Sequence, residues 1–273
     1  MTFRALAIDL DGTLLRRDET VSERNRQAVE AARAAGLQVI LATAGWFQRA
    51  ERVARPLGLF GPAITCSGAE VRRLSDGADL MDVRMPAAFA ERLYEILDAH
   101  RCIAWVALDD AVLMKIEGTP DPALLMPEIR HVPRLAGAAA GVPPRMVLVQ
   151  GTAVTAAVRE ALADEWGAKV RFISSISGYA KSILTLTAVG ADKGLALAVA
   201  CRDLGIDPAE VVAIGDADND MEMFRVAGGS FAMGQASDTV KAAAKAVTGS
   251  NDADGVAQAI ERLLAEGDAV FAR

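Results

Sequence analysis

Two carboxylates, two residues apart, close the first apolar run of the chain. The run RALAIDL, residues 4–10, is typical of a buried parallel strand and leads into Asp9-Leu10-Asp11-Gly12. Because side chains alternate along a strand, Asp9 and Asp11 project together at its carboxyl end, where open α/β sheets bind ligands. Such a pair repels unless one group is protonated or a cation such as Mg²⁺ lies between them. An acid pair that only caps a turn is the alternative, and this pair alone does not decide between the two.

A second acidic cluster follows another apolar run. VVAIGD, residues 211–216, leads into Asp216-Ala217-Asp218-Asn219-Asp220. Capping of the next helix requires only one of these polar side chains. Acidic groups at the ends of two buried strands therefore favour one shared cation site.

Two further positions indicate an anion. Thr43 ends the strand-like run at 37–43, where its hydroxyl and the amide of Ala44 can hydrogen-bond a phosphate oxygen. Lys193 opens a predicted helix, and a cation there opposes the helix dipole unless it faces an anion. An ordinary turn residue and a solvated surface lysine are the alternatives for these positions.

Strand-like and helix-like runs alternate at both ends of the chain. Strands are predicted at 4–10, 37–43, 62–68 and 211–216, and helices at 24–36 (N-cap Ser22), 47–57, 193–205, 219–228 and 254–267. This βαβαβ pattern predicts an α/β fold with a doubly wound parallel sheet and helices on both faces.

The pattern changes between about residues 81 and 187. Here helices are predicted at 87–100 and 155–166, strands at 103–109, 112–117, 145–151, 170–175 and 180–187, and a loop at 118–144. Such a segment predicts an antiparallel sheet with helices on one face. We therefore expect a core of residues 1–82 and 188–273, interrupted by an α+β domain at 83–187.

Composition limits the partners and the location. The 273 residues are 52% hydrophobic, and 29 basic against 36 acidic side chains give a net charge of −7, which argues against non-specific nucleic-acid binding. The N-terminal residues lack a signal-peptide pattern, and no apolar stretch approaches the ~20 residues of a membrane span. The cysteines lack metal-ligand or disulfide spacing. We expect a cytoplasmic protein without nucleic-acid or membrane partners.

Taken together and in order, the motifs resemble a known superfamily. DLDGTL, Thr43, DKGLAL, GDADNDMEM and NDADGVAQAI resemble the haloacid dehalogenase (HAD) superfamily, and more closely its Cof-type sugar-phosphate phosphatases. The resemblance spans the whole chain. It implies a Rossmann-like core with an inserted α+β cap, and a Mg²⁺-dependent phosphatase of small phosphorylated metabolites, sugar phosphates foremost.

The resemblance also implies a role for each motif residue. Asp9 matches the nucleophile that forms an aspartyl-phosphate, and Asp11 matches the general acid and base. Magnesium would be held by Asp9, the Asp11 backbone carbonyl and Asp216, with Asp220 nearby, and the phosphoryl oxygens would be bound by Thr43, Lys193 and Asn219. Because a halide leaving group needs no proton, an acid at Asp11 favours phosphoryl transfer over dehalogenation.

The chain departs from the family pattern in two places, and both concern the substrate. Family members often read Thr-Gly-Arg where this chain reads Thr43-Ala44-Gly45, and Asn-Gly-Ala where it reads Ser67-Gly68-Ala69. Candidate substrate contacts in the insertion are Lys115, Arg130, His131, Arg134, Arg145 and Lys181.

A phosphomutase with the same nucleophile and a catalytically silent phosphometabolite-binding protein are the alternative functions. In each case we expect a small phosphate ester as partner, and a monomer or homodimer.

Overall fold

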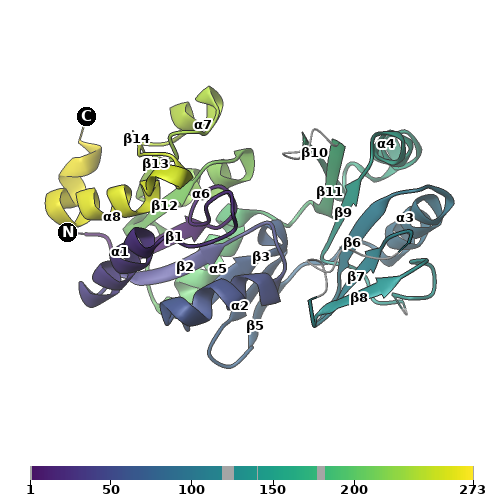
Figure 1. Ribbon diagram of the computed structural model, residues 1–273, viewed down its shortest axis with the longest axis horizontal. Coiled ribbons are helices and arrows are strands. Elements are labelled where there is room, and N and C mark those ends of the chain that lie inside the picture. Colours follow the sequence, from purple (N-terminus) through teal and green to yellow (C-terminus); the bar gives the residue numbers. More distant parts are fainter. Residues whose placement is uncertain (1, 119–125, 140, 177–181, 273) are drawn as a thin grey trace. The chain divides into compact units, whose positions relative to one another are not determined.

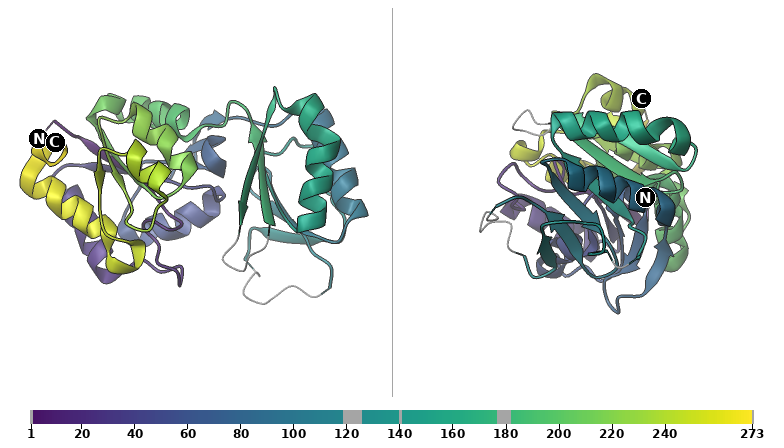
Figure 2. Two further views of the ribbon diagram at one scale, coloured as in Figure 1. Left: turned by 90° about the horizontal axis from the view of Figure 1, so that it is seen from above. Right: turned by 90° about the vertical axis from the view of Figure 1, so that its right-hand side faces the viewer.

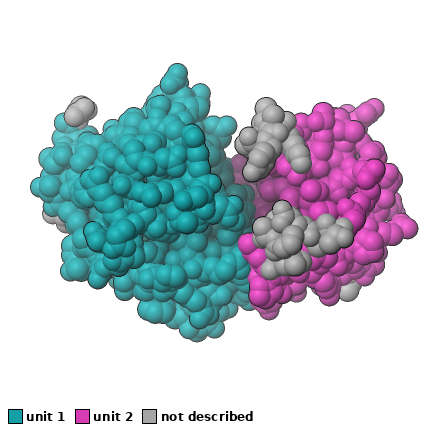
Figure 3. All heavy atoms as spheres, in the orientation of Figure 1, with its two compact units in different colours: residues 1–81, 192–273 teal, residues 82–191 magenta. Residues whose placement is uncertain are grey.

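The chain divides into two compact units, each with its own core. The structure is a computed structural model that describes residues 2–118, 126–139, 141–176 and 182–272. Unit 1 comprises residues 1–81 and 192–273, and unit 2 comprises residues 82–191 (Figure 3). The insertion was expected to begin at 83 and to end at 187.

Unit 1 is built on a sheet that has eight strands among the described residues (Figure 1). In spatial order these are β14 (Ala246–Val247), β13 (Gly229–Ala232), β12 (Val211–Gly215), β1 (Ala5–Asp9), β2 (Gln38–Ala42), β3 (Pro62–Thr65), β4 (Glu70–Arg73) and β5 (Asp79–Asp82). The pairs from β14 to β3 are parallel, and β4 runs antiparallel to β3. The predicted α/β parallel-sheet core is confirmed.

Alternate residues of the central strands face two separate cores. Leu6 and Ile8 of β1 face the first core, with α1 (Glu23–Ala34), α2 (Phe47–Ala54) and α8 (Gly255–Glu266). Ala5 and Ala7 face the second, with α5 (Lys193–Leu204), α6 (Met221–Val226) and α7 (Asp238–Ala243). A strand buried on both faces reads as a continuous apolar run, which is why the sequence signal for β1 is clear.

Unit 2 is a six-stranded sheet, in the described residues, with helices on one face. The order is β10 (Val170–Ile176), β11 (Ser182–Ala188), β9 (Met146–Gln150), β6 (Ile103–Ala107), β7 (Val112–Lys115) and β8 (Ile129–Val132). The helices α3 (Ala87–Ala99) and α4 (Thr152–Trp166) pack on one side of this sheet (Figure 2). Phe89 of α3 and Leu184 of β11 lie in the same apolar core.

Several local predictions were wrong. The sheet of unit 2 is not wholly antiparallel, because β8 pairs in parallel with β7. That strand lies inside the expected loop at 118–144, of which residues 119–125 and 140 lie outside the described residues. The strand expected at 62–68 ends at Thr65, where the chain turns through left-handed conformations at Cys66 and Ser67.

Candidate active site

The sheet register brings the predicted site residues to one edge. Asp9 lies opposite Ala42 of β2, and Ile8 lies opposite Ile214 of β12. Because the three strands are parallel, the residues that follow them, Thr43 and Asp216 among them, emerge beside Asp9. The predicted convergence of the two acidic clusters is therefore present in the fold.

Three carboxylates form the centre of this edge. Oxygen atoms of Asp9, Asp216 and Asp220 lie within 4.8 Å of one another. The Lys193 ammonium donates to Asp9 Oδ1 and to Asp220 Oδ1, each at 2.7 Å, and its side chain is 0% exposed. Its contact with the Ala42 carbonyl, at 3.4 Å, is long. Lys193 is therefore a buried partner of the acids rather than a solvated lysine.

Backbone hydrogen bonds fix the two ends of the Lys193–Asp220 ion pair. Asp220 Oδ2 accepts from the amides of Asp216 and Ala217, each at 3.0 Å. The Lys193 amide, at the start of α5, donates to Glu222 Oε2 at 2.8 Å. With their backbones and side chains held in this way, the charged groups lose little freedom when a ligand binds.

Gly12 allows the first loop to approach Asp216. It adopts φ +84°, and a Cβ there would lie 2.4 Å from Asp216 Oδ2. The hydroxyl of Thr13 donates to Asp216 Oδ1 at 3.2 Å, and Gln235 Nε2 donates to the Gly12 carbonyl at 2.6 Å. The glycine of the Asp9–Gly12 motif is thus required by both conformation and space.

The acidic cluster carries more negative charge than Lys193 can neutralise. Burial, and then repulsion from Asp220, hold the pKa of Asp9 well above its usual value although Lys193 opposes them. The same two causes raise the pKa of Asp216 to about 6. Burial opposes the charge of Lys193, yet its contacts with Asp220 and Asp9 raise its pKa. One ammonium does not neutralise three carboxylates, so a hard divalent cation that prefers oxygen ligands, such as Mg²⁺, fits this donor set.

Asp11 lies apart from the three clustered carboxylates. Its Oδ1 accepts from Arg49 at 2.5 Å, and its Oδ2 accepts from the Thr43 hydroxyl at 3.1 Å. Half of its side chain, 47%, is exposed. Arg49 was not predicted as a site residue, because it lies in the first turn of α2 and nothing in its local sequence marks it.

The loop after β2 rests on a strained turn. Gly45 donates its amide to the Thr43 hydroxyl at 2.9 Å and accepts from the Cys66 amide at 2.7 Å, and the Ser67 amide donates to the Thr43 carbonyl at 3.2 Å. Cys66 and Ser67 adopt φ +50° and +56°, which is costly for residues other than glycine. Ala44 lies half-buried in this loop. The hydrogen bonds from this turn thereby hold the backbone of Thr43 and Gly45 in place.

Asn219 carries an unsatisfied polar atom beside the acids. Its Oδ1 is buried and has no hydrogen-bond partner among the described residues. Buried polar groups are nearly always paired, so this orphaned amide oxygen can accept a hydrogen bond from a ligand, whereas a phosphoryl oxygen would be bound by the amide N–H of Asn219.

The basic candidates of the insertion are mostly engaged within unit 2. Buried Lys115 donates to the His100 carbonyl, Arg130 donates to the Ala138 carbonyl, and Arg134 lies 3.6 Å from Asp98. Buried Arg145 donates to Asp82. Both ring nitrogens of His131 are buried without a partner among the described residues, and Lys181 lies outside them. Lys115 and Arg145 are thus structural within this unit.

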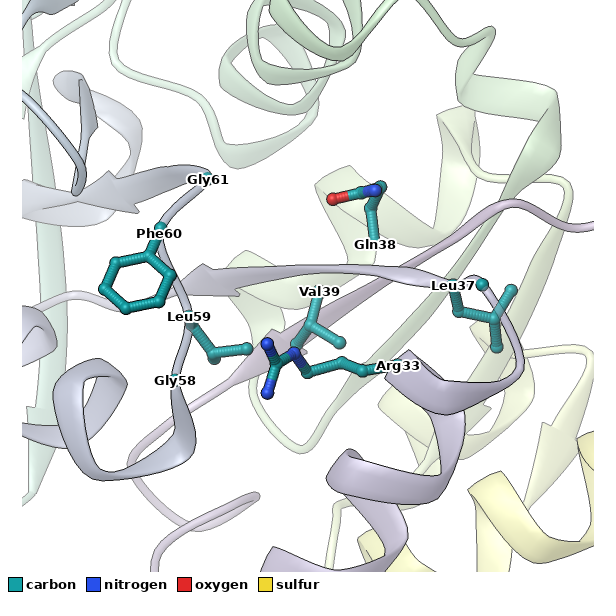
Figure 4. Close-up of a pocket in the computed structure, with 9 residues that line it drawn as sticks. Arg33, Leu37, Gln38, Val39, Gly58, Leu59, Phe60 and Gly61 are labelled. Carbon is teal, nitrogen blue, oxygen red and sulfur yellow. The ribbon is translucent and has the colours of Figure 1, made fainter.

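A separate pocket of about 260 Å³ lies at the opposite end of β2. It is lined by Arg33, Gly36, Leu37, Gln38, Val39, Gly58, Leu59, Phe60 and Gly61 (Figure 4). Arg33 is the one charged residue of this lining, and its guanidinium donates to the Leu57 carbonyl at 3.0 Å. Its lining, as far as the structure describes it, includes no acid or nucleophile, so the carboxylate edge is the candidate for chemistry.

Comparison with known proteins agrees with this geometry. The family described as haloacid dehalogenase-like hydrolase matches residues 6–260. The chain belongs to this family. The HAD chain is 29% identical over 281 residues to the pyridoxal phosphate phosphatase YbhA of Escherichia coli, which covers 95% of this chain and 98% of that protein. It is 30% identical over 260 residues to a phosphoglycolate phosphatase of Archaeoglobus fulgidus, with coverage of 95% and 96%.

The solved structures agree with the fold. A haloacid dehalogenase-like hydrolase from Bacteroides thetaiotaomicron superimposes with a TM-score of 0.83 at 28% identity, covering 96% of this chain and 99% of that one. The predicted family and fold are confirmed, and the chain is an enzyme of the phosphoric monoester hydrolase class. Among the described residues, no helix combines the length and apolarity needed to span a bilayer.

Proposed function

We propose that this chain is a Mg²⁺-dependent phosphatase that hydrolyses small phosphorylated metabolites through an aspartyl-phosphate on Asp9. The observation that carries the proposal is the buried ion pair of Asp9 with Lys193, set against two further acids. The sugar-phosphate class follows from the Cof-type pattern of the motifs. Pyridoxal phosphate and phosphoglycolate, on which the named relatives act, are the other substrates to test.

Asp9 is placed to attack. Its Oδ1 is fixed by Lys193 at 2.7 Å, so the carboxylate has one defined orientation in which its second oxygen forms the bond to phosphorus. As this bond forms, the bond from phosphorus to the ester oxygen breaks. Only one contact of the Lys193 ammonium is long, the one to the Ala42 carbonyl, and this N–H is the one free to turn toward a phosphoryl oxygen.

Asp11 handles the protons. It gives a proton to the departing ester oxygen, and then takes one from the water that attacks the phosphorus of the aspartyl-phosphate. That attack breaks the bond between phosphorus and Asp9 and releases inorganic phosphate. The half-exposed setting of Asp11 allows both exchanges, whereas Asp9 is buried and suited to covalent attack. The Thr43 hydroxyl, the Ala44 amide and Asn219 would hold the transferring group.

Asp9, Asp216 and the Asp11 backbone carbonyl would hold Mg²⁺, with Asp220 as support. The ion supplies positive charge that offsets the repulsion between a carboxylate nucleophile and a phosphate dianion.

In this proposal unit 2 acts as the cap domain of the phosphatase. Its insertion between residues 81 and 192 matches the place where the family pattern carries a cap.

The test is phosphate release from a panel of esters, with Mg²⁺ and with EDTA. The panel comprises hexose and pentose phosphates, polyol phosphates, nucleotides, flavin mononucleotide, pyridoxal phosphate and phosphoglycolate. We expect Mg²⁺-dependent release, fastest with a sugar phosphate. Following the reaction by ³¹P NMR distinguishes free phosphate from the positional isomer that a mutase would produce. Binding without turnover would indicate the catalytically silent alternative.

The matched variant is Asp9→Asn. It keeps the size of the side chain and a contact for Lys193 but removes the nucleophilic oxygen, so we expect turnover to fall by at least about 10⁴-fold with the fold intact. Retained turnover in this variant would contradict the proposal.

A further inference from the structure

Arg49 reaches the active-site edge from α2 and binds the second carboxylate of the motif. Its terminal nitrogen lies 2.5 Å from Asp11 Oδ1, while Thr43 occupies Asp11 Oδ2. The Arg49 side chain is only 20% exposed, against 47% for Asp11. The guanidinium is therefore the more buried member of the pair, and the Asp11 carboxylate lies on its solvent side.

The space for Arg49 is provided by Gly45. A Cβ at Gly45 would lie 2.9 Å from Arg49 Cδ and 3.3 Å from the Thr43 hydroxyl. Any larger side chain at position 45 would therefore displace the Arg49 stem or the hydroxyl that holds Asp11. Arg49 can occupy this position because residue 45 has no side chain.

Glu19 holds the guanidinium from its other end. Its Oε2 lies 3.6 Å from the second terminal nitrogen of Arg49, and its backbone adopts φ +63°. The guanidinium therefore has a carboxylate beside each terminal nitrogen, with the shorter contact to Asp11. The two carboxylates are exposed, and ion pairs open to solvent contribute little to folding, so we assign these contacts to orientation of Asp11 rather than to stability.

We infer that Arg49 is the positioning residue of Asp11, and that Gly45 is the residue that admits it. Arg49 and the Thr43 hydroxyl hold the two oxygens of Asp11 in the structure. When the phosphoryl group accepts the hydrogen bond of the Thr43 hydroxyl, Arg49 still holds Oδ1 and leaves Oδ2 to face the departing ester oxygen. The inference rests on the proposed function, in which Asp11 exchanges protons with the leaving group and with water.

The leaving group supplies a readout that a merely structural role would not change. An alkoxide from a sugar phosphate needs a proton as it departs, whereas the p-nitrophenolate ion is stable without one. Loss of Asp11 positioning should therefore slow the alkyl ester selectively. General damage to the fold or to phosphate binding would slow both esters by the same factor.

The experiment measures kcat and KM for glucose 6-phosphate, or the best sugar phosphate of the panel, and for p-nitrophenyl phosphate. For Arg49→Met we expect kcat on the sugar phosphate to fall by about 10- to 100-fold, and kcat on p-nitrophenyl phosphate to stay within about threefold. Arg49→Lys keeps the charge but lacks the planar set of N–H donors of a guanidinium, so it should recover part of the lost kcat on the sugar phosphate. The control is Arg55→Met, which removes an exposed ion pair with Glu51 and should change neither rate.

Gly45→Ala keeps every charge and displaces Arg49, so it should reproduce the selective loss in weaker form. It also serves if Arg49→Met folds poorly. Equal losses on both esters in these variants, or an unchanged rate on the sugar phosphate, would overturn the inference alone. Wild-type protein that hydrolyses neither ester would overturn the proposed function and the inference with it.

Discussion

Lys193 in unit 1 and Arg145 in unit 2 are both buried cations, and their charges are satisfied differently. Lys193 in unit 1 is fully buried against Asp9 and Asp220, with Asp216 close by. Arg145 in unit 2 is 2% exposed and donates to both oxygens of Asp82, at 2.8 and 3.2 Å. The same guanidinium also donates to the carbonyls of Leu108 and Asp109.

The acids beside these cations report the difference. Burial acts against the charge of Asp82, but hydrogen bonds from Arg145 and Arg84 outweigh it and lower its pKa. At Asp9 burial and the neighbouring acids outweigh the contact with Lys193, and the pKa is raised. A buried charge whose partners match it holds a fold together, whereas a cluster with surplus negative charge is prepared for a cation and a reaction. Burial of a lysine or arginine alone therefore does not identify a site.

Removing each cation in turn is the strongest test of this contrast. Lys193→Met takes the ammonium from Asp9 and Asp220. Arg145→Met takes the guanidinium from Asp82, which keeps Arg84, and from two backbone carbonyls. Each variant should lower the free energy of unfolding by about 3–5 kcal/mol. Only Lys193→Met should abolish chemistry, with kcat/KM lower by at least about 10³-fold, since it removes the charge that orients Asp9. Urea unfolding and steady-state kinetics measure the two effects.

The contrast fails if Arg145→Met loses as much kcat per folded molecule as Lys193→Met. It also fails if Lys193→Met keeps its activity while losing stability.

The sequence predicted the parts of the site that depend on local pattern. Asp9, Thr43, Lys193 and Asp216 each follow or begin a long apolar run, and the register of parallel strands brings such ends together. The core strands were also clear, because burial on both faces leaves few polar residues in them.

The rest depends on contacts between distant residues. Arg49 meets Asp11 across 38 positions of the chain, a pairing that no local pattern encodes. The sequence around Arg145 does not distinguish it from a surface arginine, because its partner Asp82 lies far away in the chain. The strands β4 and β5 read EVRR and DLMD, so their charged side chains hide the strand pattern, and β14 has only two residues.

A smaller effect should follow from Gly12→Ala, which disturbs the acidic cluster without changing its charge. The new Cβ would meet Asp216 Oδ2 at 2.4 Å, so the carboxylate must move from its place in the cluster. We expect kcat/KM to fall by about 10- to 100-fold and the Mg²⁺ requirement to rise. Gly77→Ala is the matched control, because Gly77 also has positive φ, +70°, but among the described residues no atom beyond its chain neighbours lies within 4 Å of its added Cβ. The control should lose about 1 kcal/mol of stability and keep its activity; a similar loss of activity in both variants would contradict the role of Asp216.

The smallest effect is a pH dependence of metal stabilisation. The pKa of Asp216 is about 6 in the folded protein against an ordinary 3.8, so the cation-free fold binds a proton that the unfolded chain has released. Its stability should therefore fall as pH rises from about 4 to about 6, and Mg²⁺, which needs the deprotonated acid, should compensate. We expect Mg²⁺ at a fixed concentration, about 100 times its Kd at pH 7.5, to add about 2.7 kcal/mol at that pH and much less near pH 5, where its Kd is higher. Thermal unfolding with Mg²⁺ or EDTA measures this; an equal increase in Tm at both pH values, or one that persists in Asp216→Asn, would contradict it.

Acid-quenched single turnover with peptide mapping tests most directly whether Asp9 receives the phosphoryl group. The enzyme, in excess over the best substrate of the panel and with Mg²⁺ present, is quenched in acid, digested and analysed by mass spectrometry. The Asp11→Asn variant lacks both the acid for the leaving group and the base for hydrolysis, so it is treated in parallel with p-nitrophenyl phosphate, whose leaving group departs without a proton. We predict one phosphoryl group on the peptide that contains Asp9, present briefly in the wild type and persisting in the variant. Phosphate release with no phosphoryl group on that peptide in either protein, or with the group on another residue, would contradict the account.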